Sequence, residues 1–320
     1  MPADLPAVAA DPFADVAREP GAAKPDPILK VDGVRRQFGG LVAVDVDHLE
    51  FQRGVITALI GPNGAGKTTF FNLITGFDQP NTGAWEFNGE SMGKMAPHQV
   101  ARKGMIRTFQ LTKALAKMTV IENMKLGATG QRGERMLPSL LPFLWRRQES
   151  EIEAQADELL ARFKLDHMRE EFAGSLSGGQ RKLLEMARSL MAKPELVMLD
   201  EPMAGVNPAL TQSLLGHVKN LREEGMSVIF VEHDMDVVFD ISDWVVVMAE
   251  GRIIAEGPPD AIGSNKEVID AYLGAHHDSD LSDWEEEAVI AEVTGAHGDV
   301  IGSELHLGAD DGPDPTGDDA

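Results

Sequence analysis

A glycine-rich octapeptide between an apolar run and a predicted helix constrains the fold more than any other feature. Residues 61–68 read GPNGAGKT and follow residues 55–60 (VITALI), an apolar run with the length of a buried strand. Glycines at this spacing let successive backbone N–H groups turn inward, and the N-terminus of a helix starting near Lys67 adds partial positive charge. The segment fits G-x-x-x-x-G-K-[ST] and predicts a phosphate-binding loop.

The side chains of this loop suit a nucleoside polyphosphate. Lys67 can reach the β- and γ-phosphates, and the Thr68 hydroxyl can ligate Mg²⁺. A chance glycine-rich turn is the alternative, and the flanking strand and helix argue against it. The candidate binding residues are Gly61, Pro62, Asn63, Gly64, Ala65, Gly66, Lys67, Thr68 and Thr69.

Further apolar runs alternate with helical stretches along the chain. Residues 196–199 (LVML), 228–231 (VIFV) and 244–248 (WVVVM) each have the length of a buried strand. Residues 251–257 (GRIIAEG) resemble a small β element. This alternation predicts an α/β fold with a largely parallel sheet.

Composition divides the chain into three parts. Residues 1–27, rich in Ala, Pro and Asp, are expected to form a flexible leader before a domain over residues 28–274. Residues 111–185 lose the β-type runs and are predicted to form a helical subdomain, with an amphipathic helix at 149–163. Residues 275–320 hold 14 Asp and Glu and no Lys or Arg, which predicts a disordered acidic tail.

Charge and cysteine content exclude several classes of function. The net charge is −23, and removing the 14 charges of the tail still leaves −9. An acidic surface repels phosphate backbones, so we expect no nucleic-acid partner. The absence of cysteine excludes disulfides, thiolate metal sites and cysteine nucleophiles, and it suits a reducing cytoplasm.

The sequence predicts no secretory signal and no membrane-spanning helix. The first 21 residues carry acids before any base and lack a long apolar run. No uninterrupted apolar run reaches the ~18–20 residues that a membrane helix needs. Residues 137–145 are interrupted by Pro138 and Pro142.

An aspartate and a glutamate follow the apolar run at residues 196–199. Ligands of open α/β sheets bind at the carboxyl ends of strands, so Asp200 is placed to hold Mg²⁺ directly or through water. Glu201 points in a different direction and can polarise an attacking water as general base. Alone, such a pair is more often a solvated strand end, and the phosphate loop upstream favours catalysis.

A second anion cradle precedes a helix predicted from Arg181 to about Ala192. Two glycines at a helix start expose backbone N–H groups, and Ser177 can act as cap and hydroxyl donor. An ordinary capped helix is the alternative. Asp200 lies 23 residues beyond Ser177, with one helix and the strand between them, which favours ligand binding. The candidate residues are Ser177, Gly178, Gly179 and Gln180.

The order GPNGAGKTT, LSGGQ, LVMLDEP resembles the ATP-binding cassette (ABC) family over about residues 28–274. The resemblance implies a P-loop NTPase with a mostly parallel core, a β subdomain and a helical signature subdomain. It implies ATP and Mg²⁺ as cofactors. It also implies two cassettes paired head to tail, with each ATP between one phosphate loop and the opposite signature turn.

Three further positions match the same family. Gln110, in RTFQ, resembles the glutamine that touches Mg²⁺ or water and senses the transport partner. His233, in VEHD, resembles the switch histidine that contacts the γ-phosphate, and Phe38 resembles the aromatic that stacks on adenine. The alternatives are a surface glutamine, a structural histidine and a core phenylalanine.

Within the family, five segments resemble cassettes of branched-chain amino acid importers. They are FGGLVAVD, RTFQ, AGVNP, VEHDMDVV and GRIIAEGPP. Many cassettes carry aspartate where Asn207 stands, so an electrostatic role is not expected at this position. The inserted LLPFLWRR also has a counterpart there, either as a packed linker or as a partner contact.

The sequence therefore predicts an ATPase subunit of an importer on the inner face of the cell membrane. It would dimerise with a second ATP-binding subunit beneath membrane permease subunits, and an external solute-binding protein would deliver the solute. A lipid or polysaccharide exporter has similar cassettes and stays open. A soluble cassette of DNA repair is disfavoured by the absence of sustained heptads between Lys67 and Ser177, and a ribosomal cassette by the single cassette. A non-catalytic regulator would lack Lys67 or Glu201.

Overall fold

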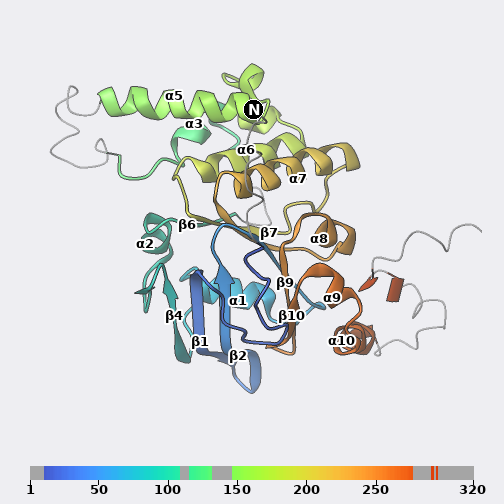
Figure 1. Cartoon of the computed structure of the whole chain (residues 1–320). Helices are drawn as coiled ribbons and strands as arrows, with labels where there is room; N and C mark the ends of the chain where they lie inside the picture. The colour runs from blue at the N-terminus through green and yellow to red at the C-terminus, as the bar shows by residue number, and fades with distance from the viewer. Residues whose placement is uncertain (1–10, 109–114, 132–145, 277–289, 292, 295–320) are drawn as a thin grey trace, which may run out of the picture.

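The computed structural model describes residues 11–108, 115–131, 146–276, 290–291 and 293–294. Two sheets form the lower part of the molecule, and a group of helices forms the upper part (Figure 1). Within the described residues, no helix has the length and apolarity needed to cross a bilayer.

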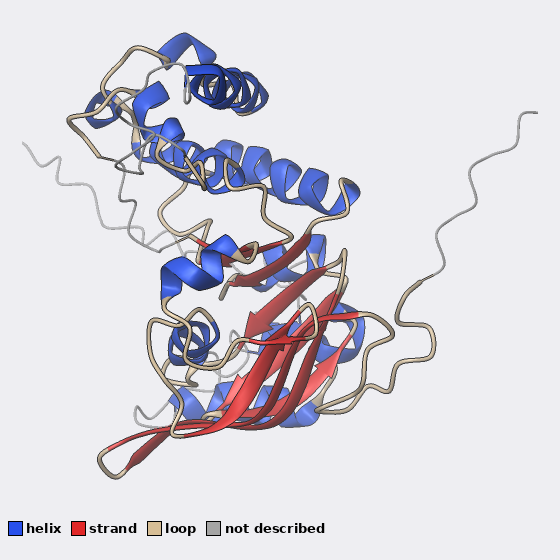
Figure 2. Cartoon of the chain, turned by 90° about the vertical axis from the view of Figure 1, so that its left-hand side faces the viewer, coloured by secondary structure: helices blue, strands red, loops and turns tan. Residues whose placement is uncertain are grey.

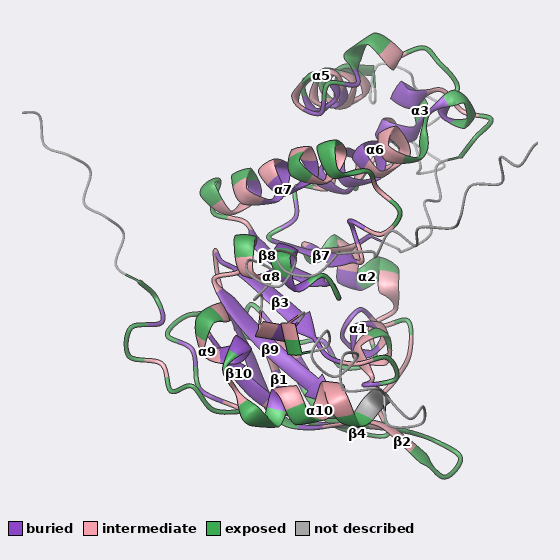
Figure 3. Ribbon diagram, turned by 90° about the vertical axis from the view of Figure 1, so that its right-hand side faces the viewer, coloured by how far each residue is buried: buried purple, intermediate pink, exposed green. Residues whose placement is uncertain are grey.

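The larger sheet has six strands, and all neighbours in it are parallel except β10 and β9. Its short strands are buried on both faces because helices or the second sheet cover each face (Figure 3). The strands predicted from the apolar runs and the small β element are confirmed. In sheet order they are β10 (Arg252–Gly257), β9 (Trp244–Ala249), β3 (Ile56–Ile60), β8 (Ser227–Val231), β7 (Leu196–Asp200) and β6 (Met105–Arg107).

The smaller sheet is antiparallel and packs beside the larger one (Figure 2). Together with α1 (Lys67–Ile74) it covers one face of the parallel strands, in a cluster that includes Phe70, Phe71 and Trp85. Its strands, in sheet order, are β2 (Leu41–Gln52), β1 (Pro27–Phe38), β4 (Thr82–Phe87) and β5 (Glu90–Ser91).

Helices cover the other face and form the upper layer (Figure 1). The amphipathic helix predicted at residues 149–163 is α5, and the helix predicted after the second glycine pair is α6. The bounds are α2 (Pro97–Arg102), α3 (Val120–Lys125), α5 (Arg146–Arg162), α6 (Gly178–Leu190), α7 (Pro208–Glu223), α8 (Met235–Ile241), α9 (Pro259–Gly263) and α10 (Lys266–His276). Residues 137–145 lie outside the described residues.

The N-terminal segment corrects one prediction, because residues 11–26 are not a flexible leader. Phe13 is buried and stacks on Trp244 with ring centroids 4.4 Å apart. The Lys24 ammonium lies 2.9 Å from Glu256, and both side chains are almost fully buried. Glu256 also accepts hydrogen bonds from the Ala22 N–H and the Trp244 indole N–H. These contacts fasten the segment to β9 and β10.

We expect Lys24→Met to lower the free energy of unfolding by about 3 kcal/mol, because it leaves the Glu256 carboxylate buried without its cation. The two remaining N–H donors to Glu256 keep the loss at the lower end of the range for a broken buried pair. Arg147→Met is the control, since Arg147 and Glu151 form an exposed pair, and it should change stability by less than ~0.5 kcal/mol. Urea unfolding of both variants measures the difference, and equal losses would contradict the burial argument.

The C-terminal boundary also differs from the prediction. Helix α10 continues two residues past Gly274, and Val293 is fully buried in the same apolar cluster as Ile262 and Val268. At least this part of the stretch expected to be a disordered tail therefore packs on the domain.

His217 on α7 packs against the end of α5. Its ring stacks on Phe163 at 4.2 Å between centroids, and burial lowers its pKa, assisted by the nearby charges of Arg162 and Lys164. The folded state therefore favours the neutral ring, and stability should fall as pH drops below the unfolded pKa of about 6.5. We expect His217→Gln to lose less stability than wild type between pH 7.5 and 5.5 in urea titrations; equal losses would contradict this.

Candidate functional site

The predicted active-site segments gather along one edge of the six-stranded sheet. Residues 61–66 follow β3, His233 follows β8 by two residues, and Asp200 ends β7. β8 lies between β3 and β7, and all three strands run parallel. Their carboxyl ends therefore meet at the same edge, where open α/β sheets bind ligands.

The phosphate loop depends on glycine at its two ends. Gly61 has φ 145°, and a Cβ there would lie 1.9 Å from the Met248 carbonyl oxygen. Gly66 has φ 102°, and a Cβ there would lie 2.3 Å from the carbonyl oxygen of Ala43. A side chain at either position is sterically excluded, so the loop can take this path only with glycine at both positions. The helix predicted near Lys67 begins at that residue as α1.

Lys67 is held inside the loop that precedes it. Its ammonium donates to the carbonyl oxygens of Gly61 at 2.5 Å and Pro62 at 3.0 Å. Burial lowers its pKa, and the carboxylates of Glu201 and Asp200 partly offset that shift. A lysine ammonium held in this loop at the N-terminus of α1 has the chemistry to bind phosphate oxygens.

Asp200 makes a contact that the sequence did not reveal. Its carboxylate lies 2.6 Å from the guanidinium of Arg107, the last residue of β6, and both side chains are almost fully buried. Arg107 also donates to the side chain of Asn72 on α1 at 2.7 Å. The neighbouring strands β6 and β7 are therefore joined to the helix that leaves the phosphate loop.

Glu201 has a backbone conformation that is rare for its residue type. Its φ is 46°, in the left-handed region, where a side chain costs about 1–2 kcal/mol. Hydrogen bonds of its backbone hold it there: its N–H donates to the Val231 carbonyl at 3.0 Å, and its own carbonyl accepts from the Lys182 ammonium at 3.0 Å and from the Ala204 N–H at 3.2 Å. Such strain is typical of functional positions, and it turns Glu201 away from the strand direction of Asp200.

His233 is exposed, with 68% of its side chain accessible, so the structural alternative of a core histidine is excluded. The preceding residue, Glu232, is 1% exposed and accepts a hydrogen bond from the Met203 N–H at 2.8 Å. Burial raises the pKa of Glu232, and the Met203 hydrogen bond partly offsets that shift. Glu232 therefore ties the end of β8 to the loop that follows Glu201.

The second anion cradle forms the N-terminus of α6. The Ser177 hydroxyl accepts from the Gln180 N–H, and the Gln180 side chain accepts from the Ser177 N–H, which is a reciprocal capping box. A Cβ on Gly179 would collide with Leu210 at 1.7 Å, whereas a Cβ on Gly178 would meet nothing within 4 Å. The cap predicted at Ser177 is confirmed.

Phe38 and Asn207 lie within the described residues, and Gln110 does not. Phe38 is 48% exposed, which excludes the core alternative, and the Arg36 guanidinium lies 4.5 Å from its ring. The strand that pairs with Phe38 also carries Ala43, whose carbonyl approaches Gly66. Asn207 caps α7 by accepting from the Leu210 N–H at 3.0 Å, which uses its side chain without any charge.

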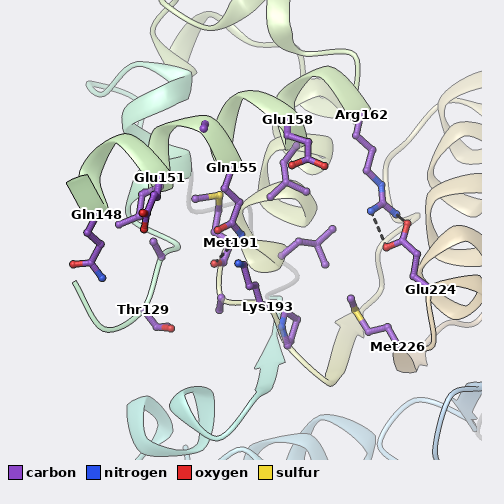
Figure 4. A pocket seen from close by; sticks show the side chains of 17 residues that line it. Thr129, Gln148, Glu151, Gln155, Glu158, Arg162, Met191, Lys193, Glu224 and Met226 are labelled. Carbon is purple, nitrogen blue, oxygen red and sulfur yellow. Dashed lines mark hydrogen bonds and ion pairs between the residues drawn. The ribbon is translucent and has the colours of Figure 1, made fainter. Parts of the chain in front are cut away.

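A groove of about 800 Å³ lies elsewhere, along α5 (Figure 4). The ion pair of Arg162 with Glu224 closes one end of it, and Met191 and Lys193 lie on its floor. Its lining includes none of the site residues predicted from the sequence.

Comparison with known proteins identifies the family of this chain. A family model described as ABC transporter matches residues 44–204, and one described as branched-chain amino acid ATP-binding cassette transporter matches residues 252–278. The probable branched-chain amino acid transport ATP-binding protein LivG of Archaeoglobus fulgidus is 42% identical over 79% of this chain and 98% of its own length. The high-affinity branched-chain amino acid transport ATP-binding protein BraF of Pseudomonas aeruginosa is 41% identical over 78% of this chain and 98% of its own.

Solved structures lead to the same family. The crystal structure of an ATP-binding cassette from an ABC transporter in its ADP conformation has a TM-score of 0.68 and 36% identity, covering 78% of this chain and 99% of that one. A nucleotide-free cassette has a TM-score of 0.67 and 36% identity, covering 77% and 98%. With its phosphate loop, its serine-capped α6 and the acidic pair at the end of β7, the chain belongs to the ABC transporter family, as an ATP-binding, ATP-hydrolysing cassette.

Proposed function

We propose that this chain energises the uptake of branched-chain or related amino acids by hydrolysing ATP beneath a membrane permease. The observation that carries the proposal is the convergence of the phosphate loop, Asp200, Glu201 and His233 at the carboxyl edge of one sheet. The solute class is supported by the names of the relatives and by the match at residues 252–278.

Each site residue has a proposed part in phosphoryl transfer to water. The loop N–H groups and Lys67 bind the β- and γ-phosphates, and Phe38 stacks on the adenine. Glu201 accepts a proton from the attacking water as general base. His233 donates a hydrogen bond to the γ-phosphate, and its exposure leaves it free to do so. Catalysis in such a site comes mainly from positioning and charge stabilisation.

The residues present fit a Mg²⁺ ion beside the nucleotide. Mg²⁺ prefers oxygen ligands, and the Thr68 hydroxyl, Gln110 amide and Asp200 carboxylate supply them. Thr68 is the second residue of α1 and Asp200 is the last of β7, so both belong to the edge described above. Bound there, Mg²⁺ would neutralise charge on the phosphate oxygens.

The proposed assembly contains a pair of ATP-binding subunits, either two copies of this chain or this chain and a different one. This cassette pairs with a second ATP-binding subunit, contacts permease subunits on the inner face of the cell membrane, and receives its solute indirectly from an external binding protein. ATP closes the pair of cassettes, and hydrolysis by Glu201 reopens it.

Uptake measurements test the proposed function. We expect deletion of the gene to reduce uptake of labelled leucine or valine by whole cells, and the wild-type gene to restore it. A plasmid carrying Glu201→Gln should not restore it. Unchanged uptake of both amino acids, together with loss of another solute or of lipid or polysaccharide export, would refute the assigned solute class.

A further inference from the structure

Arg107 makes a charged contact at the proposed Mg²⁺ site that no part of the proposed mechanism uses. Its guanidinium Nη2 lies 2.6 Å from Oδ2 of Asp200, with side-chain exposures of only 4% and 6%. Water therefore screens this pair poorly, and the interaction is far stronger than that of a surface pair. The Asp200 carboxylate is thus not a free ligand in this structure.

The position of Arg107 is fixed from three sides. Its other terminal nitrogen, Nη1, donates to the Asn72 side chain at 2.7 Å. The guanidinium carbon lies 5.4 Å from the centre of the Phe71 ring. The backbone of Arg107 ends β6, which pairs in parallel with β7 opposite Met198. A planar guanidinium held this way can bridge Asn72 and Asp200 at once, which a lysine ammonium on a flexible stem would do less well.

We infer that Arg107 is a positioning residue that holds the Asp200 carboxylate while Mg²⁺ is absent and thereby sets the Mg²⁺ concentration at which the nucleotide site fills. The inference rests on the proposed role of Asp200 as a Mg²⁺ ligand. A divalent ion that approaches Asp200 must share the carboxylate with Arg107 or displace it, and the two cations repel each other. Arg107 thus makes the Asp200 site weaker for the ion than an unpaired carboxylate would be.

The same geometry connects the ion to the rest of the chain. Arg107 is also hydrogen-bonded to Asn72, and this bond would still tie Arg107 to α1 if Mg²⁺ displaced it from the carboxylate. Arg107 precedes Gln110 by three residues in the sequence RTFQ. Arg107 therefore connects the Asp200 carboxylate to both β6 and α1.

The test is a Mg²⁺ titration of the full-length chain with saturating ADP, followed by thermal melting. Two variants remove the cation: Arg107→Met removes all polar contacts, and Arg107→Gln keeps an amide that donates to Asp200. Arg222→Met is the matched control, because Arg222 pairs with Asp243 at 2.8 Å and Asp243 precedes β9 at the opposite edge of the sheet. Each protein gives a melting temperature without Mg²⁺ and a half-saturating Mg²⁺ concentration.

Without Mg²⁺, both Arg107 variants should have a lower melting temperature than wild type. Their melting temperature should reach half of its Mg²⁺-dependent increase at an about tenfold lower Mg²⁺ concentration than that of wild type. Arg222→Met should keep the wild-type half-saturation even if it melts lower. The inference would be overturned if Arg107→Gln needed the same Mg²⁺ concentration as wild type, or a higher one, for half-saturation. If Arg107→Met does not fold, the result for Arg107→Gln alone decides the test. If wild type itself shows no Mg²⁺-dependent rise with ADP, the proposed Mg²⁺ site fails instead.

Discussion

Replacing Glu201 by glutamine should reduce ATP hydrolysis by about 10²–10⁴-fold while leaving ATP binding intact, since a general base contributes rate enhancements of that size. Gln keeps the shape of the side chain and its hydrogen-bonding capacity but cannot accept the proton. The backbone of residue 201 is held by Val231 and Lys182 through its own N–H and carbonyl, so the substitution should not disturb the loop. Steady-state phosphate release and equilibrium nucleotide binding measure the two effects separately.

Glu195→Gln is the matched control for this prediction. Glu195 immediately precedes β7, whereas Glu201 immediately follows it, so the same chemical change is made at the two ends of one strand. Glu195 pairs with Arg53 on the surface, away from the phosphate loop. Its variant should hydrolyse ATP at the wild-type rate. Turnover of Glu201→Gln within a few-fold of wild type would remove Glu201 from the role of general base.

The fold was predictable wherever local sequence and tertiary environment favour the same structure. The strands β3, β7, β8 and β9 are continuous apolar runs because the sheet is covered on both faces, and such runs are visible in a sequence. The phosphate loop was predictable for a different reason, since Gly61 and Gly66 occupy positions where no side chain fits. In both cases the residue type follows from its own immediate surroundings.

The N-terminal segment was not predictable because its anchors are far from their partners in sequence. Its composition is that of a leader, and two of the side chains that fasten it are Phe13, which stacks on Trp244, and Lys24, which pairs with Glu256. These contacts join residues more than two hundred positions apart, and no local pattern reports them. The ion pair between Arg107 and Asp200 was not predictable for the same reason, although both residues lie in motifs that are recognisable in the sequence.

Gly178 raises a different question, because the described chain does not explain why this position is glycine. A Cβ there would meet nothing within 4 Å, and its φ is not in the left-handed region. Gly179 next to it is explained by Leu210, and Gly61 by Met248. A glycine that leaves open space at an exposed helix N-terminus suits close approach by something outside the chain, such as a phosphate group bound to the second cassette.

This argument leads to an expected result for mixed dimers. Chains carrying Lys67→Ala and chains carrying Gly178→Asp should each fail to trap ATP alone. When the two are mixed, a shared site predicts that one site of the heterodimer is intact, because the Lys67 of one chain faces the Gly178 of the other. A private site within each chain predicts that both sites are broken. We therefore expect ATP occlusion in purified heterodimers of this pairing.

A second pairing, with both substitutions in one chain, gives the opposite expectation. A chain carrying both lesions, combined with wild type, has no intact shared site but one intact private site, so no occlusion is expected. Gly178→Asp should fold, since the space at this position is open and an aspartate in the first turn of a helix is electrostatically favourable. A thermal melt of this variant checks that point. Occlusion in the double-lesion pairing with none in the split pairing would show that each chain holds its own complete site, and the glycine at 178 would then need another explanation.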